Sequence, residues 1–251
     1  MSRSVQSLFG IGLCLFAGIS AVVPKASASN NATWAKRATP FNLSCPSRNQ
    51  LLWSPDRQRS VEVLCAKHGE GDPTYSLRLI NTNDGSYTLP LRDGAKELLW
   101  APDSNAFFIN GSESAYAGFF VIAYQIIAGT PHERVITVQA EKDMVDTFPP
   151  CKAANRDEAT CVSEAREPQW NMSGVGWSSD SKSIFVFGEV PCSSSHGGIM
   201  CQVMGYRVDA ANGTILKRLS ARQVKAQWDG MMGWQMHAPD PPVYGTPYVP
   251  H

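Results

Sequence analysis

The chain has 251 residues, 43% of them hydrophobic, which is enough apolar content to bury the core of one domain. It contains 22 Lys and Arg against 22 Asp and Glu, with no basic stripe, so we expect no nucleic-acid partner. No Cys-x-x-Cys pair occurs, and we expect neither a zinc site nor a bound cofactor.

The first segment, residues 1–28, is predicted to be a secretory signal peptide. Arg3 supplies a positive start, residues 8–23 form an apolar run, and residues 26–28 offer a small-residue cleavage site. The run is shorter than the roughly 20 residues that span a bilayer, and Pro24 ends it. We expect a secreted or periplasmic protein without stable membrane insertion after signal cleavage. An uncleaved anchor is the alternative.

A short motif, which we call the Trp motif, occurs three times after an N-terminal extension at residues 29–44 that could supply one further strand. The copies occupy residues 51–56, 98–103 and 175–180. Each copy is an apolar approach that ends in Trp, followed by a Pro-Asp or Ser-Asp turn. Such a turn brings two strands back antiparallel, so each copy predicts a β-hairpin.

A second hairpin is predicted after each Trp motif. Turn-forming residues near 81–85, 129–131 and 209–213 separate pairs of strand-like runs. The chain therefore predicts three four-stranded antiparallel units. Trp53 and Trp100 are about 47 residues apart, close to the period of a propeller blade.

The Trp-Ser-Pro-Asp motif resembles that of the TolB-type and WD-repeat-like β-propellers, in which it joins the first two strands of each blade. The resemblance extends from residue 50 to about residue 218 and implies an all-β fold of propeller-type blades at residues 45–219, with the Trp packed between blades. It implies no activity, because propellers serve as scaffolds, binding modules and enzyme domains alike. Three blades are fewer than the four or so that usually close a ring. The sequence allows two arrangements: an open stack of blades, or a ring that is closed by a second copy of the chain.

The cysteines predict disulfides, because an exported chain with an even number of them favours pairing. Six remain when Cys14 in the leader is set aside. Hairpin geometry places Cys45 opposite Cys65, while Cys192 and Cys201 flank one loop. The predicted pairs are Cys45–Cys65, Cys151–Cys161 and Cys192–Cys201. Free buried thiols are the alternative.

The loops between the second and third strands, together with those that join blades, should open on one face. They comprise residues 66–74, 111–117, 191–200 and the insertion 140–169. Binding residues commonly lie on loops held by a rigid scaffold, and we select His68, Tyr116 and His196 as the candidate binding face. The alternatives are spacer loops and, within the insertion, a degenerate blade.

No residue pattern predicts catalysis. Ser195 precedes His196, but no nucleophile elbow is present. Asp56, Asp103 and Asp180 recur at every turn, which suits turn formers better than a single reaction centre. Five Asn-x-Ser/Thr sequons begin at Asn31, Asn42, Asn110, Asn171 and Asn212.

The C-terminal region, residues 220–251, should contain a short helix and a Pro-rich tail. The helix is predicted over residues 219–228, with Ser220 as its N-cap and Gly230 beyond its end, and should cover an edge of the last blade. Residues 238–251 should be extended.

These observations favour an exported, non-catalytic binding or scaffolding module with a protein or envelope ligand. We assign no catalytic, cofactor-binding or metal-binding residue. One alternative is a secreted hydrolase that uses His68, His196 or His237 on the loop face, and another is a structural protein of the envelope.

Overall fold

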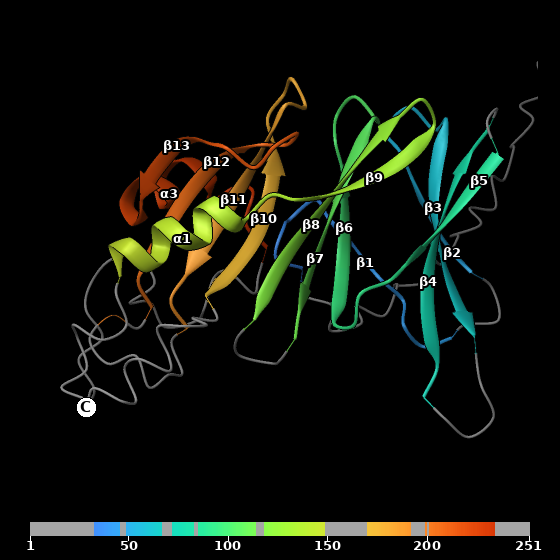
Figure 1. The fold of residues 1–251 in the computed structure, drawn as a ribbon, viewed down its shortest axis with the longest axis horizontal. Coiled ribbons are helices and arrows are strands. Elements are labelled where there is room, and N and C mark those ends of the chain that lie inside the picture. The colour runs from blue at the N-terminus through green and yellow to red at the C-terminus, as the bar shows by residue number, and fades with distance from the viewer. Residues whose placement is uncertain are drawn as a thin grey trace, which may run out of the picture. The chain divides into compact units, whose positions relative to one another are not determined.

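Figure 1 shows the computed structural model of the chain. It describes residues 33–45, 49–66, 72–82, 85–113, 118–148, 170–191, 199 and 201–233. The predicted leader and the whole Pro-rich tail lie outside these residues. Within them, no helix is long and apolar enough to cross a membrane.

The described residues form three antiparallel sheets, which confirms the predicted all-β class with propeller-type four-stranded blades. The first sheet contains β2 (Gln50–Trp53), β3 (Arg59–Ala66), β4 (Thr74–Asn81) and β5 (Gly85–Pro90). The second contains β6 (Ala95–Trp100), β7 (Ala106–Ser112), β8 (Phe119–Ile127) and β9 (Thr130–Val135). The third contains β10 (Asn171–Trp177), β11 (Ser183–Glu189), β12 (Val203–Asp209) and β13 (Ile215–Ser220). The N-terminal extension does supply a strand, β1 (Thr39–Pro40), which pairs with β6 and makes the second sheet five-stranded.

The turn of the first Trp motif is closed by its own backbone and by one carboxylate. The Ser54 amide donates to the Arg59 carbonyl at 2.9 Å, and the Arg57 amide donates to the Ser54 carbonyl at 2.9 Å. Arg57 adopts φ 58°, and the Gln58 amide donates to Asp56 Oδ1 at 2.9 Å. The other copies repeat this turn, with the left-handed residue at Ser104 (φ 64°) and Ser181 (φ 59°). The repeated aspartates are therefore turn formers, as expected.

The same two hydrogen bonds join each sheet to the next, and we call this pair the inter-blade connector. Between the first and second sheets, the Trp100 indole donates to the Leu52 carbonyl at 3.1 Å, and the Asp56 amide donates to Ser104 Oγ at 3.1 Å. Between the second and third sheets, the corresponding bonds are Trp177 to the Leu99 carbonyl (3.2 Å) and the Asp103 amide to Ser181 Oγ (3.0 Å). Each Trp thus bonds to the sheet before its own.

Trp53 corrects the prediction that all three motif tryptophans are buried. Trp100 and Trp177 are each 9% exposed, whereas Trp53 is 48% exposed. No described sheet precedes the first one, so no sheet among the described residues packs over the Trp53 indole. The turn beside it also carries Arg57 where the later turns carry the connector serines.

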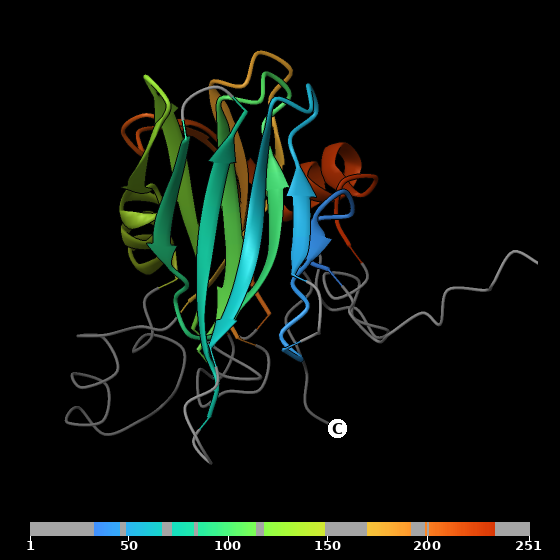
Figure 2. The same cartoon turned by 90° about the vertical axis from the view of Figure 1, so that its right-hand side faces the viewer.

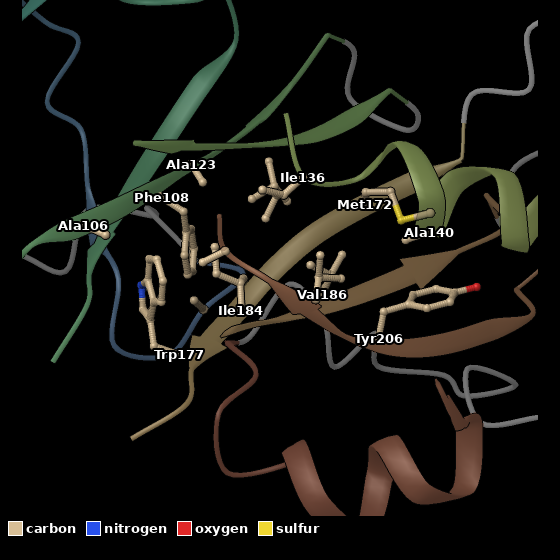
Figure 3. Packing of buried hydrophobic residues seen from close by; sticks show 14 of the residues in the cluster. Ala106, Phe108, Ala123, Ile136, Ala140, Met172, Trp177, Ile184, Val186 and Tyr206 are labelled. Atoms are coloured by element: carbon tan, nitrogen blue, oxygen red, sulfur yellow. The ribbon is translucent and has the colours of Figure 1, made fainter. Parts of the chain in front are cut away.

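Two apolar layers lie between the three sheets. The layer between the first and second sheets includes Val61, Leu79 and Phe107. The layer between the second and third sheets joins Phe108 of β7 to Trp177 of β10, whose rings are 5.8 Å apart (Figure 3). The two buried clusters that contain residues of the third sheet include none from the first sheet, so the three described sheets form an open stack.

The outer face of the third sheet is covered by α3 (Ala221–Trp228). Ser220 and Gln223 form a capping box that begins the helix, which confirms Ser220 as the N-cap. Val224 and Trp228 are buried over this face, and a Cβ at Gly205 would lie 2.5 Å from Val224 Cγ2. The glycine lets the helix approach the face of the sheet, rather than the edge that the sequence suggested.

The segment expected to be a long loop begins with a helix, α1 (Val138–Thr147). Ala140 and Met144 are fully buried against the third sheet, where Met144 Sδ lies close to Gly188. The start of the insertion is therefore helical and does not form the strand of a degenerate blade. Residues 149–169 lie outside the described part.

One predicted disulfide is confirmed. Cys45 and Cys65 are bonded, with their Cα atoms 5.4 Å apart. Cys201 is also disulfide-bonded, to a partner outside the described residues. Cys151, Cys161 and Cys192 lie outside them as well, so the other two pairings stay predictions.

Candidate functional site at the loop end of the sheets

The three sheets share two distinct ends, which we call the turn end and the loop end. The turn end carries the three Trp-motif turns. At the loop end, strands are paired in register up to Ala66–Thr74, Ser112–Phe119 and Glu189–Val203, from which the loops between second and third strands leave. Figures 1 and 2 show these strand ends on the lower side and the Trp-motif turns on the upper side.

The residues predicted for binding belong to loops that leave from this end. His68, Tyr116 and His196 all lie outside the described residues, so their mutual distances are not part of the structure. What the structure does give is the position of the loop stems. All three stems lie at the loop end, opposite the turns of Asp56, Asp103 and Asp180.

The stem of the first loop is held by the disulfide. Cys65 on β3 is bonded to Cys45, which ties the N-terminal extension to this end of the first sheet. Tyr75, paired in register with Cys65, donates its hydroxyl to the Leu43 carbonyl. Two independent links thus fix the segment around residue 43 beside the stem of the first loop.

The stem of the second loop is held by charged and aromatic contacts. The Glu113 amide donates to the Gly118 carbonyl at 3.1 Å, which closes the loop at its base. Arg92 pairs with Glu113 at 2.6 Å, and its guanidinium carbon lies 4.4 Å from the centre of the Phe120 ring. Both charged side chains are half exposed. One cation and one anion thus lie together beside an aromatic ring at this stem.

The stem of the third loop contains a buried carboxyl group. Glu189 at the end of β11 faces Asn171 of β10, with Asn171 Nδ2 3.4 Å from Glu189 Oε2. Burial raises the pKa of Glu189 to about 7, although the hydrogen bond from Asn171 opposes the shift. This carboxyl group therefore changes charge near neutral pH at the loop end.

A second buried carboxyl group, Glu97, was not predicted. Its Oε2 accepts from the Trp34 amide at 2.8 Å, and its Oε1 accepts from the Ala35 amide at 2.9 Å and from Asn110 Nδ2 at 2.7 Å. Burial raises the pKa of Glu97 to about 7, against the effect of these donors. Glu97 thus holds the N-terminal segment against the second sheet.

Asn110 extends this network to the third sheet. Its Nδ2 donates to the Gly174 carbonyl at 2.7 Å, and the Gly174 amide donates to its Oδ1 at 2.8 Å. Asn110 and Asn171, which begin two of the sequons, are both buried within strands, so their side chains are closed to modification in the fold. Because its polar atoms are all engaged, the Glu97–Asn110 pair is structural.

We expect Glu97 to make stability depend on pH. Its folded pKa of about 7 exceeds its ordinary value of 4.5, so between these pH values the folded chain holds a proton that the unfolded chain releases. The free energy of unfolding should therefore fall as pH rises from about 4.5 to 7, by at most about 1.4 kcal/mol per pH unit for this group. Chemical unfolding at a series of pH values measures this slope.

Glu97→Gln should make the slope shallower, and adding Glu189→Gln should reduce it further, because that carboxyl group shifts in the same direction. Asp93→Asn, which changes an exposed carboxyl group, is the matched control and should leave the slope unchanged. An identical slope in Glu97→Gln and the wild type would contradict the assignment.

The described residues bring together no catalytic arrangement. Among them, no cluster of three His, Cys, Asp or Glu side chains is placed to hold a metal ion. Of the five histidines, only His132 on β9 lies within the described residues, and it is exposed. A hydrolase would need His68, His196 or His237 close to one another and to an acid. All three histidines lie outside the described residues.

No family model matches the chain, and no curated protein matches it. Among solved structures, it is similar to Pyrococcus horikoshii acylaminoacyl peptidase at 10% identity and a TM-score of 0.37, over 72% of this chain and 26% of that one. The β-propeller domain of the Trilobed protease from Pyrococcus furiosus is similar at 9% identity and a TM-score of 0.34, over 74% of this chain and 43% of that one. An acylaminoacyl peptidase in complex with Z-Gly-Gly-Phe-chloromethyl ketone is similar at 10% identity and a TM-score of 0.35, over 74% of this chain and 25% of that one.

The chain matches less than half the length of each of these proteins. At these TM-scores the likenesses carry no argument about activity. The fold class rests instead on the three antiparallel sheets and the connectors between them.

Proposed function

We propose that the chain is an exported, non-catalytic binding or scaffolding module whose partner contacts the loop end. The observation that carries this proposal is the division between the two ends of the sheets. The turn end is occupied by the inter-blade connectors, whereas the loops between the second and third strands leave from the opposite end. Loops on a rigid scaffold are the usual location of binding residues.

Export is part of the proposal and rests on the leader and the cysteines. Residues 1–28 have the composition of a signal peptide. The Cys45–Cys65 bond and the bonded Cys201 are typical of an oxidising compartment. A TolB-type or WD-repeat-like identity is consistent with the Trp motif, and we propose it at that level alone.

A secreted hydrolase is the second candidate function, favoured by one observation. Glu189 supplies a carboxyl group with a pKa of about 7 at the base of the third loop, which suits a general acid or base. In this candidate, His68, His196 or His237 would act with it. A structural role in the envelope has no comparable observation in its favour.

The test compares substitutions at the two ends. A partner is first captured from the native envelope with the oxidised chain. His68→Ala, Tyr116→Ala and His196→Ala together should weaken its binding at least about tenfold, while each lowers the free energy of unfolding by less than about 0.5 kcal/mol. Titration of the partner against each variant, with unfolding curves alongside, measures both effects.

The matched control is Gln58→Ala, Asn105→Ala and Lys182→Ala, which changes exposed side chains at equivalent positions of the three turns. These changes should leave binding intact. Loss of binding in this control, with unchanged binding in the loop-end variant, would contradict the proposal. Hydrolysis of a substrate by the purified chain, abolished by His196→Ala, would establish the second candidate instead.

A further inference from the structure

The outer face of the first sheet is the one sheet face in the described stack that neither another sheet nor a helix covers. We call it the uncovered face. From the strand registers, its residues are Leu51 and Trp53 of β2, Ser60, Glu62 and Leu64 of β3, Ser76, Arg78 and Ile80 of β4, and Ser86 and Thr88 of β5. It corresponds to the faces through which the second and third sheets pack against the sheet before them.

The uncovered face is apolar at one side. Trp53 and Leu51 are 48% and 45% exposed, and Ile80 lies in the same row as Trp53, one strand beyond Ser60. The indole N–H of Trp53 has no acceptor among the described residues, whereas those of Trp100 and Trp177 both donate to carbonyls. This face therefore presents the apolar surface and the free donor that the other two sheets use in their interfaces.

The charges on this face neutralise each other. Arg78 Nε donates to Glu62 Oε2 at 2.7 Å, and Asn49 Nδ2 donates to Glu62 Oε1 at 2.9 Å. Glu62 on β3 and Arg78 on β4 are paired directly across the two strands. A second copy of this face would thus approach without repulsion between like charges.

Addition of copies head to tail is blocked at the other end of the stack. Such a contact would need the outer face of the third sheet, which Val224 and Trp228 of α3 occupy. Arg57 also stands where a connector serine would be needed to continue the repeat backward. The uncovered face is therefore left to pair with an identical face.

We propose that two copies of the chain associate through the uncovered face about a two-fold axis. The product is a continuous stack with α3 at both outer ends, in which each contact is made twice. Four strands about 4.8 Å apart, each about six residues long, give a face of roughly 400 Å² per copy. This size lies at the low end for a specific interface, so the association should be reversible and depend on concentration.

Sedimentation velocity on the oxidised chain over about a hundredfold range of concentration tests the proposal. The average mass of the wild type should rise from one chain toward two and no further. Trp53→Arg combined with Leu51→Glu should remain at the mass of one chain throughout. Both side chains are half exposed, so this variant should fold, which its unfolding curve verifies.

Val135→Glu is the matched control, because Val135 is 64% exposed on the second sheet, away from the uncovered face. It should associate like the wild type. A wild type that stays at one chain at every concentration would overturn the proposal. Equal association of the Trp53 and Leu51 variant, or growth beyond two copies, would overturn it as well. If the uncovered face binds a different protein and the chain does not self-associate, the proposal is overturned and the face is the binding site for that protein.

Discussion

Trp100→Ala and Trp177→Ala should each lower the free energy of unfolding by about 3 to 5 kcal/mol, whereas Trp53→Ala should lower it by less than about 1 kcal/mol. The first two indoles are buried between sheets and donate to Leu52 and Leu99 of the preceding sheet. Trp53 makes neither contact. Chemical unfolding of the three variants measures the difference.

Trp100→Phe and Trp177→Phe separate the contribution of packing from that of the hydrogen bond. Phe retains most of the ring contacts but leaves the Leu52 or Leu99 carbonyl without its indole donor, so each should cost less than the Ala variant. Equal losses for Trp53→Ala and Trp100→Ala would show that the first sheet is covered, and would contradict the open stack.

Asn110→Ala should lower the free energy of unfolding by about 3 to 5 kcal/mol, because three buried groups lose a partner at once. These are Glu97 Oε1, the Gly174 carbonyl and the Gly174 amide. Each unsatisfied group costs about 1 to 3 kcal/mol, and relaxation of the site recovers part of the sum. The same unfolding measurement applies.

Asn105→Ala is the control for this prediction. Asn105 is an exposed residue of the turn between β6 and β7, and loss of its side chain should change stability by less than about 0.5 kcal/mol. If Asn110→Ala were as mild as Asn105→Ala, the Glu97–Asn110 network would not hold the second and third sheets together.

The blades were predictable from sequence because their signals are local. A Pro-Asp turn between alternating strands specifies a hairpin within a few residues, and the turn of Ser54 and Arg59 recurs in the other two copies. The start of α3 was predictable for the same reason, since Ser220 caps it from the adjacent position.

The features that sequence reasoning missed depend on distant neighbours. The three Trp motifs are locally alike, yet Trp53 is exposed because no sheet precedes it. Asn110 suggested a sequon, but its burial follows from its place facing Gly174, 64 residues away. In α1, only Ala140 and Met144 are buried, so its sequence shows little helical periodicity.

The candidate site could be predicted only as a set of loops at one end. The loop stems follow from strand order alone, and they lie where expected. The carboxyl group of Glu189 gave no signal in the sequence, because its shifted pKa results from burial in the folded chain.

Hydrogen exchange of backbone amides, followed by mass spectrometry on the dilute chain, tests the open stack most directly. Peptides from β7 and β8 should exchange slowly, because the second sheet is covered on both faces. Peptides from β3 and β4 should exchange faster, since one face of the first sheet is uncovered. Equal protection of β3 and β7, at concentrations too low for copies to associate, would contradict the account.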